Sequence, residues 1–195
     1  MADSSTPSAA ERLLDTASRL FYARGIPNVG INEIIARAGV ARMTLYHHFS
    51  SKDALVKAVL EARRRERGAW LERADDLAAD PRGKILAVFD LLESWAQAPD
   101  FRGCPLVAAS FELGGQFNAA LPYARDHLDS VRAFFEERAR QAGAADPTAL
   151  AAQLQLLLEG ATVTALVQGT AGPANDARAA AAALVDLQLQ RARVS

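Results

Sequence analysis

Residues 30–53 read GINEIIARAGVARMTLYHHFSSKD, and the fold is predicted from this stretch outward. It predicts two short helices joined by a tight turn at Gly39, followed by a third helix that begins near Ser51. Gly39 supplies the left-handed residue that reverses the chain. The middle helix carries arginine, threonine, tyrosine and two histidines, and almost no carboxylate lies near it. Such a set of donors and aromatic rings suits the major groove of DNA better than a catalytic pocket.

The composition of the 195-residue chain indicates a globular all-α protein. Half of the residues are hydrophobic and 23% are charged. Apolar residues recur at helical spacing, and no β-branched run alternates with a period of two. No stretch reaches about 18 consecutive apolar residues, so we expect no transmembrane helix. The N-terminal stretch lacks the regions of a secretory signal, and the single cysteine fits a reducing cytoplasm.

The net charge of −1 hides an uneven distribution of charge. Residues 1–67 contain 11 Lys and Arg against 7 Asp and Glu, whereas residues 68–195 contain 11 against 16. A basic N-terminal third on an acidic body indicates that one end of the protein meets a polyanion. Random partition of charge is the alternative interpretation of a difference of this size.

Helix signals divide the chain into nine predicted helices. A glycine or a proline follows most apolar stripes, and Asp146-Pro147 places an N-cap before a proline at the first helical position. Within the fourth helix, residues 61–67 are polar all round, which is typical of a solvated connector. The expected helices cover about 8–23, 32–38, 42–49, 52–78, 82–98, 105–113, 121–142, 147–166 and 174–193.

The sequence TLYHHFSSK at residues 44–52, with the two helices before it, resembles the TetR family of bacterial transcriptional regulators. The resemblance covers residues 11–60 and includes Phe21 four residues before Gly25, the Ala38-Gly39-Val40 turn and the Ser-Lys-Asp cap. Beyond residue 60 it extends to architecture only. It implies an N-terminal arm and helix-turn-helix DNA-binding domain at residues 1–50 and a ligand-binding and dimerisation domain at 51–195, connected by the helix at 51–78.

The resemblance implies that residues 42–48 form the recognition helix in the major groove. Arg42, at its first turn, would read guanine through O6 and N7. The other implied contacts go to phosphate, to sugar or to a thymine methyl group, with a histidine reaching a base. The implied DNA-binding residues are Asn32, Arg42, Met43, Thr44, Tyr46, His47, His48 and Lys52.

Two positions depart from the pattern of the family. Position 41 is alanine where the family often has serine or threonine, so the recognition helix lacks a side-chain cap, at a cost of about 1 kcal/mol. Position 43 is methionine where glycine or proline is frequent. Its thioether would either touch a base methyl group or shield the helix.

Three features near the recognition helix have a second interpretation. Tyr46 either contacts DNA or packs on the first helix. His47 and His48 are adjacent, whereas metal ligands on one helix need a spacing of three or four and a further ligand, so we expect no metal site. The arginines at 63–65 form either a DNA contact or, as we favour, a solvated face.

The C-terminal domain is expected to bind a small hydrophobic or aromatic effector, with no cofactor. Its candidate lining combines apolar and aromatic side chains with a few polar ones, although each apolar residue also fits an ordinary core. Cys104, in a Gly-Cys-Pro sequence, is either a redox-sensitive thiol or a small buried residue. The candidate ligand-binding residues are Phe89, Leu92, Trp95, Cys104, Ser110, His127, Gln155, Glu159 and Thr162.

The last two helices are rich in small residues that allow close packing. They either pack within one subunit or pair with a second copy in a four-helix interface. The residues predicted for this homodimer interface are Leu154, Leu158, Ala161, Ala165, Ala180, Leu184 and Leu187.

The sequence therefore predicts a homodimeric, ligand-responsive repressor that binds a palindromic DNA operator and is released by its effector. We expect no enzyme, because the bundle lacks the paired carboxylates and histidines of a metal site, and no serine or cysteine has a nearby partner for nucleophilic catalysis. The alternatives are an all-α small-molecule or lipid-binding protein without DNA binding, and a protein–protein adaptor.

Overall fold

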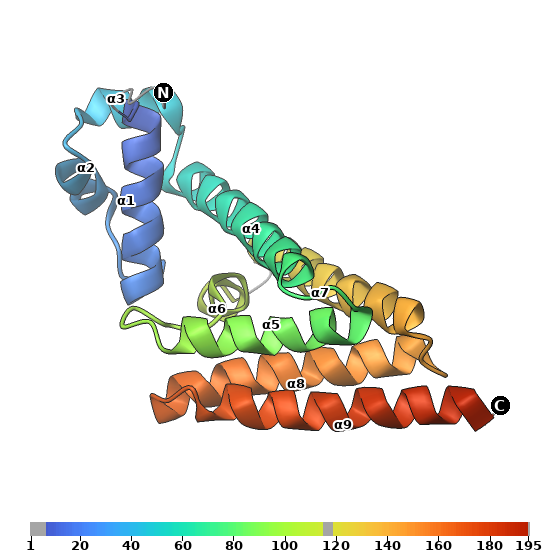
Figure 1. Cartoon of the computed structure of the whole chain (residues 1–195). Coiled ribbons are helices and arrows are strands. Elements are labelled where there is room, and N and C mark those ends of the chain that lie inside the picture. The colour runs from blue at the N-terminus through green and yellow to red at the C-terminus, as the bar shows by residue number, and fades with distance from the viewer. Residues whose placement is uncertain (1–6, 115–118, 195) are drawn as a thin grey trace, which may run out of the picture. The chain divides into compact units, whose positions relative to one another are not determined.

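The computed structural model describes residues 7–114 and 119–194 of the chain (Figure 1). Within these residues the backbone forms nine α-helices and no strand, which confirms the predicted all-α class. Each predicted helix is present, with ends that differ by a few residues at most. The helices are α1 (Ala9–Arg24), α2 (Ile31–Ala38), α3 (Arg42–His48), α4 (Lys52–Asp76), α5 (Pro81–Ala96), α6 (Pro105–Glu112), α7 (Leu121–Ala142), α8 (Pro147–Gln168) and α9 (Gly172–Val194).

Local capping interactions set where several helices begin. At α1, the Glu11 amide donates to the Ser8 hydroxyl at 3.2 Å, and the Ser8 amide donates to the Glu11 carboxylate at 2.7 Å. This reciprocal pair satisfies two amides that a helix start leaves without partners. Asp80 caps α5 and Asp146 caps α8, and each is followed by proline at the first helical position. These ends are therefore encoded by a few adjacent residues.

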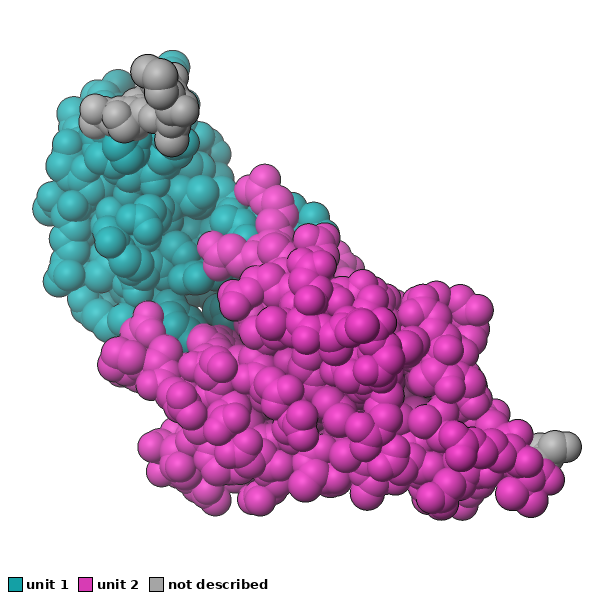
Figure 2. All heavy atoms as spheres, in the orientation of Figure 1, with its two compact units in different colours: residues 1–64, 105–124 teal, residues 65–104, 125–195 magenta. Residues whose placement is uncertain are grey.

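The chain divides into two compact units (Figure 2). Unit 1 comprises residues 1–64 and 105–124, and unit 2 comprises residues 65–104 and 125–195. The first half of α4 and the whole of α6 thus belong to the unit that contains α1, α2 and α3. Leu55 and Leu60 of α4 are buried, so the helix at this point is part of a core and not a free connector. The domain boundary expected after residue 50 stays a prediction; α4 contributes residues to both units.

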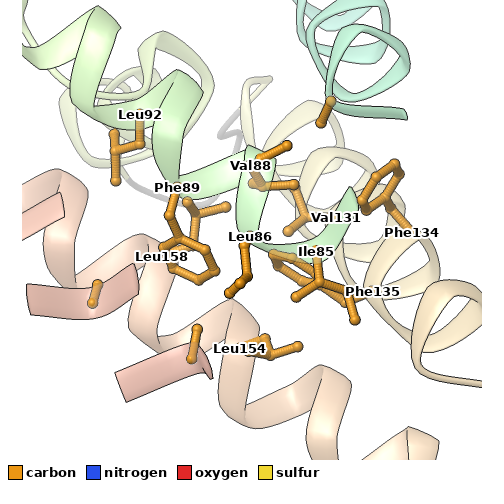
Figure 3. Close-up of a cluster of buried hydrophobic side chains, with 14 of the residues drawn as sticks. Ile85, Leu86, Val88, Phe89, Leu92, Val131, Phe134, Phe135, Leu154 and Leu158 are labelled. Atoms are coloured by element: carbon orange, nitrogen blue, oxygen red, sulfur yellow. The ribbon is translucent and has the colours of Figure 1, made fainter. Parts of the chain in front are cut away.

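Unit 2 is built around aromatic side chains from α5 and α7. The rings of Phe89 and Phe135 are stacked with centroids 6.0 Å apart, and Phe134 meets Phe135 edge to face at 5.9 Å (Figure 3). Leu154 and Leu158 of α8 reach the same cluster and are buried. Because the contributing helices are far apart in sequence, this core fixes the arrangement of the whole unit.

A row of polar contacts joins α5 to α9. Arg82 forms a bidentate pair with Asp186 at 2.7 and 2.9 Å, Arg178 pairs with Asp90, and the Asn175 amide donates to Glu93 at 2.9 Å. The contact residues of α5 advance by eight and then three positions, and their partners on α9 go back by eight and then three positions. The two helices are therefore antiparallel, and the pairs fix one register. Exposed ion pairs add little free energy individually, and their main effect here is to specify that register.

Helix α8 is long and apolar enough, by length and composition alone, to span a membrane. Its position in unit 2 accounts for this character without a membrane, because Leu150, Leu154 and Leu158 lie in the core. The opposite face carries further apolar residues, which are described below.

The core predicts a large difference between two substitutions on α5. Phe89→Ala removes a fully buried ring and should lower the free energy of unfolding by about 3–5 kcal/mol. Ser94→Ala lies on the exposed side of the same helix, where the hydroxyl donates to the Asp90 carbonyl, and should change the free energy of unfolding by less than about 0.5 kcal/mol. Urea unfolding followed by circular dichroism, at one protein concentration, measures both. Equal losses would mean that the cluster is not the core.

Candidate nucleic-acid interface

The turn between α2 and α3 has the conformation expected for a helix-turn-helix. Gly39 adopts φ 63° and ψ 42°, in the left-handed region, and its amide donates to the Ala36 carbonyl at 3.3 Å. The Val40 amide donates to the Ile35 carbonyl at 3.4 Å. These bonds satisfy the end of α2 and let α3 begin at Arg42. The predicted turn is confirmed.

Helix α3 is held to unit 1 by one side only. Leu45 is fully buried and Phe49, directly after the helix, is half-buried. The N-cap residue Ala41 makes no side-chain hydrogen bond, as its identity predicted. A seven-residue helix is not stable in isolation, so α3 depends on the burial of Leu45 against the core of unit 1, which includes Ile34.

The other side of α3 presents its donors to solvent. Arg42, Met43, Tyr46, His47 and His48 are all exposed. The Arg42 guanidinium lies 5.9 Å from the centre of the Tyr46 ring, and the two histidine rings meet edge to face at 5.1 Å. Within the described residues, no protein acceptor is hydrogen bonded to these arginine and histidine side chains. The exposure of Tyr46 favours an outward contact over packing on α1.

The remaining predicted DNA contacts lie in different surroundings. Asn32 is exposed in the first turn of α2, and Thr44 is half-buried. Lys52 differs from the expectation of a phosphate contact, because its amine donates to the Ile26 carbonyl at 2.8 Å and lies 5.9 Å from the centre of the Phe21 ring. The sequence placed Lys52 at the start of α4 but did not show that the α1–α2 loop passes within reach of its amine.

A second contact holds the same loop from α6. The Ile26 amide donates to the Glu112 carboxylate at 2.7 Å, so both backbone groups of Ile26 are bound by charged side chains. Gly25 has φ 82°, and a Cβ there would lie 3.2 Å from the Glu112 carboxylate. Hydrogen bonds to charged groups contribute about 1.5–3 kcal/mol each. Sequence reasoning missed Glu112, because no local pattern relates it to a residue 86 positions earlier.

The arginine run in α4 splits between structural roles. Arg63 stacks over Tyr22 of α1 at 5.3 Å and donates to the Ser18 carbonyl at 3.5 Å. Arg64 pairs with Glu61 at 2.7 Å on the surface. Arg65 is exposed, as expected for a solvated face.

Arg67 forms the centre of a polar cluster inside unit 2. Its guanidinium lies 4.1 Å from the Trp70 ring centre and 4.5 Å from that of Trp95. Burial, helped by the charge of Arg67, lowers the pKa of His127 to about 4. Burial raises the pKa of Glu159, an effect that Arg67 opposes. The structure thus brings three predicted ligand residues, Trp95, His127 and Glu159, around an arginine that the sequence reasoning treated as part of a solvated run.

The other predicted ligand residues belong to the core of unit 2, make hydrogen bonds within that unit, or lie in unit 1. Phe89 and Leu92 are fully buried in the core, so their role as ligand contacts stays a prediction. Gln155 donates to the Leu128 carbonyl at 2.6 Å and accepts from Arg132 at 3.0 Å, and Thr162 donates to the Leu158 carbonyl at 2.8 Å. Cys104 is buried, which fits the small-residue interpretation, and Ser110 lies on α6 in unit 1.

The residues predicted for a dimer interface fall into two groups. On α8, Leu154, Leu158, Ala161 and Ala165 are buried within the subunit. On α9, Ala180 and Leu187 are exposed and Leu184 is half-buried. The exposed apolar stripe of α8 is offset by two residues from the predicted one and consists of Leu156, Gly160, Val163 and Val167, with Leu156, Val163 and Val167 exposed by 74%, 56% and 80%.

The buried histidine predicts how stability depends on pH. The unfolded chain binds a proton at His127 with a pKa near 6.5, whereas the folded chain does so only near 4. Between these values the unfolded state holds more protons, so this contribution to stability is complete above pH 6.5 and is lost as the pH falls toward 4. From pH 7 to 4, the free energy of unfolding of the wild type should fall by on the order of 3 kcal/mol more than that of His127→Gln.

Urea titrations at each pH measure this difference. His47→Gln is the matched control, because it removes an exposed histidine of α3 and should retain the wild-type pH dependence. An unchanged pH dependence in His127→Gln would contradict the prediction.

Comparison with known proteins agrees with this geometry. Residues 13–59 match the family model described as bacterial regulatory proteins, tetR family, and residues 81–181 match the tetracyclin repressor-like C-terminal domain. The crystal structure of SCO4454, a TetR-family transcriptional regulator from Streptomyces coelicolor, is 30% identical in sequence. It superposes with a TM-score of 0.81 over 94% of this chain and 95% of that chain.

Curated relatives match over shorter lengths. The HTH-type transcriptional repressor NemR of Escherichia coli K12 is 32% identical over 108 residues, which is 53% of each chain. An uncharacterized HTH-type transcriptional regulator of Mycobacterium tuberculosis H37Rv, Rv1255c, is 41% identical over 83 residues, 42% of this chain and 40% of that protein. The chain thus spans about half the length of these two relatives or less. From the two family models and the full-length structural match, the chain belongs to the TetR family of bacterial transcriptional regulators, which are not enzymes.

Proposed function

We propose that this protein is a homodimeric repressor that binds a palindromic operator through its two α3 helices and is released by a small hydrophobic effector. The observation that carries the proposal is the exposed side of α3, where a guanidinium, a phenol and two imidazoles face solvent on a helix that contains no acidic residue. The major groove offers acceptors on its base edges and phosphates at its rims, which match these donors. As a DNA-binding regulator, the protein would act in the cytoplasm.

The exposed polar side chains of α3 are assigned roles by their positions. Arg42 reads guanine, because its fork matches O6 and N7. Tyr46, His47 and His48 contact phosphate or sugar, and one histidine reaches a base. Asn32 of α2 contacts the backbone from the first turn of its helix, while half-buried Thr44 has a smaller reach. Because Lys52 is bound to the Ile26 carbonyl, its phosphate contact would require that bond to be shared or broken.

The charge of the N-terminal third supports the same partner. Residues 1–67 contain four more basic than acidic side chains, although the whole chain has a net charge of −1. A basic end attracts the phosphate backbone and makes binding depend on salt.

The outer side of α8 and α9 supports a second copy of the chain as a partner. The stripe Leu156, Gly160, Val163 and Val167 recurs at helical spacing on the side of α8 that the subunit leaves uncovered. A shallow groove of about 360 Å³ runs between α8 and α9, and Gly160, Ala177 and Ala180 are among its lining residues. Small residues there allow a partner helix to approach closely.

The interior of unit 2 supports an effector with an apolar or aromatic body. Trp95 meets Phe101 edge to face at 4.8 Å and also covers one side of Arg67. His127 and Glu159 add polar groups that interact with Arg67 beside these aromatic rings, and a few polar groups among aromatic ones are the usual composition of a small-molecule site. Release from the operator follows if the effector prefers a conformation of the dimer in which the two α3 helices no longer fit successive major grooves, about 34 Å apart.

Arg42 provides the direct test of DNA binding. A palindrome is selected from a random duplex pool with the wild-type protein, and its affinity is measured by fluorescence anisotropy at several salt concentrations. Arg42→Ala should weaken binding by about 1–3 kcal/mol per half-site and relax selection at one G·C pair. Arg19→Ala is the control, because Arg19 lies on α1 in an exposed pair with Asp15. A wild-type protein without sequence-selective, salt-dependent binding would favour a small-molecule carrier that does not bind DNA.

The dimer interface is tested by one charge on the outer stripe of α8. Val163→Glu places a carboxylate in the middle of the exposed apolar side and should convert the dimer to a monomer in sedimentation velocity. Leu77→Glu is the control, since Leu77 is also exposed, by 59%, but lies directly after α4. If Val163→Glu sediments as a dimer at the same concentration, the second copy does not bind through this face.

A further inference from the structure

An exposed methionine lies in the middle of the DNA-facing side of α3. Met43 is 79% exposed, so it has little part in holding the subunit together. At about 100° per residue, Arg42, Tyr46, Met43 and His47 follow one another across an arc of about 140°. Met43 and Tyr46 occupy the centre of this arc, and Arg42 and His47 form its edges.

The neighbours of Met43 are polar or aromatic. Arg42 lies beside the ring of Tyr46 at 5.9 Å, and the two histidines contact each other at the end of the helix. The thioether is therefore an isolated apolar group within a set of hydrogen-bond donors. A protein–protein interface buries a contiguous apolar patch, and one isolated methionine does not form such a patch. A DNA groove offers acceptors for the donors and an isolated methyl group for the thioether.

In the major groove, the C5-methyl group of thymine is the apolar group on an unmodified base edge. We propose that Met43 recognises a thymine of each half-site through this methyl group, next to the guanine assigned to Arg42. The inference rests on the proposed DNA-binding function and deepens it, because it names a base and the atom that is read. Arg42 selects by hydrogen bonds and Met43 by apolar contact, so each discriminates a feature that the other does not.

The size of the effect follows from the burial of one methyl group. Removing such a group from an apolar contact weakens binding about fourfold. Deoxyuridine pairs like thymidine and lacks only this methyl group. Replacing single thymidines by deoxyuridine in one half-site of the selected palindrome therefore measures the contact with no change in hydrogen bonding.

The wild-type protein should bind one deoxyuridine duplex about fourfold more weakly than the parent duplex, as measured by fluorescence anisotropy at fixed salt. Met43→Ala should bind these two duplexes equally. Met43→Leu should keep the difference, since leucine preserves an apolar group. Arg42→Ala should bind all duplexes more weakly but retain the difference.

The inference is overturned if no deoxyuridine position affects the wild type, or if Met43→Ala keeps the full difference. Circular dichroism checks that Met43→Ala is folded, as its exposure indicates, and Met43→Leu supplies a second reading of the same contact. A failure of the proposed function gives a separate result, in which the wild type enriches no sequence from the pool. That result would overturn both proposals, whereas selective binding without a methyl effect would overturn this one alone.

Discussion

The burial of Leu45 is the constraint on which the exposed side of α3 depends. Helix α3 has seven residues, no side-chain cap and no ion pair within the described residues. Its intrinsic stability is too low for it to form alone, so its conformation is supplied by one inward side chain and by the turn at Gly39. Because the helix packs against the unit on one side, the side chains on its opposite side are not needed to hold the fold. Arg42, Met43, Tyr46 and His47 are exposed for this reason.

The α1–α2 loop shows how distant segments complete the unit that contains α3. Lys52 of α4 binds the carbonyl of Ile26, and Glu112 of α6 binds its amide. Two oppositely charged side chains thus bind the backbone amide and carbonyl of one residue after the end of α1. Helix α6 belongs to unit 1 although it follows α5 in sequence. In unit 2, Arg67 lies between two indoles, and its charge acts on two neighbours. Burial, helped by this charge, lowers the pKa of His127, and burial raises the pKa of Glu159 against the effect of Arg67.

Local signals predicted the helices well, and the candidate site less completely. The capping residues Ser8, Asp80 and Asp146 act through bonds within three residues, so their effect is visible in sequence. The exposure of the donors on α3 was also predictable, because a short helix with one apolar anchor must leave its polar side chains in solvent. The partners of Lys52 and Arg67 were not predictable, since each depends on a loop or ring brought near by folding. The sequence showed that both residues are basic and lie on a helix, but it did not show which groups they contact.

The sequence by itself determined the nine helices, the turn at Gly39 and the chemistry of the side chains on α3. These features depend on neighbours within a few residues, through capping, glycine conformation and helical spacing. Only the tertiary structure decided which side of α8 faces inward. Leu154, Leu158, Ala161 and Ala165 repeat at the same spacing as Leu156, Gly160, Val163 and Val167, two residues further on. Both stripes are free of charged residues, so periodicity does not distinguish them. Packing against α5 and α9 buries the first stripe and leaves the second exposed.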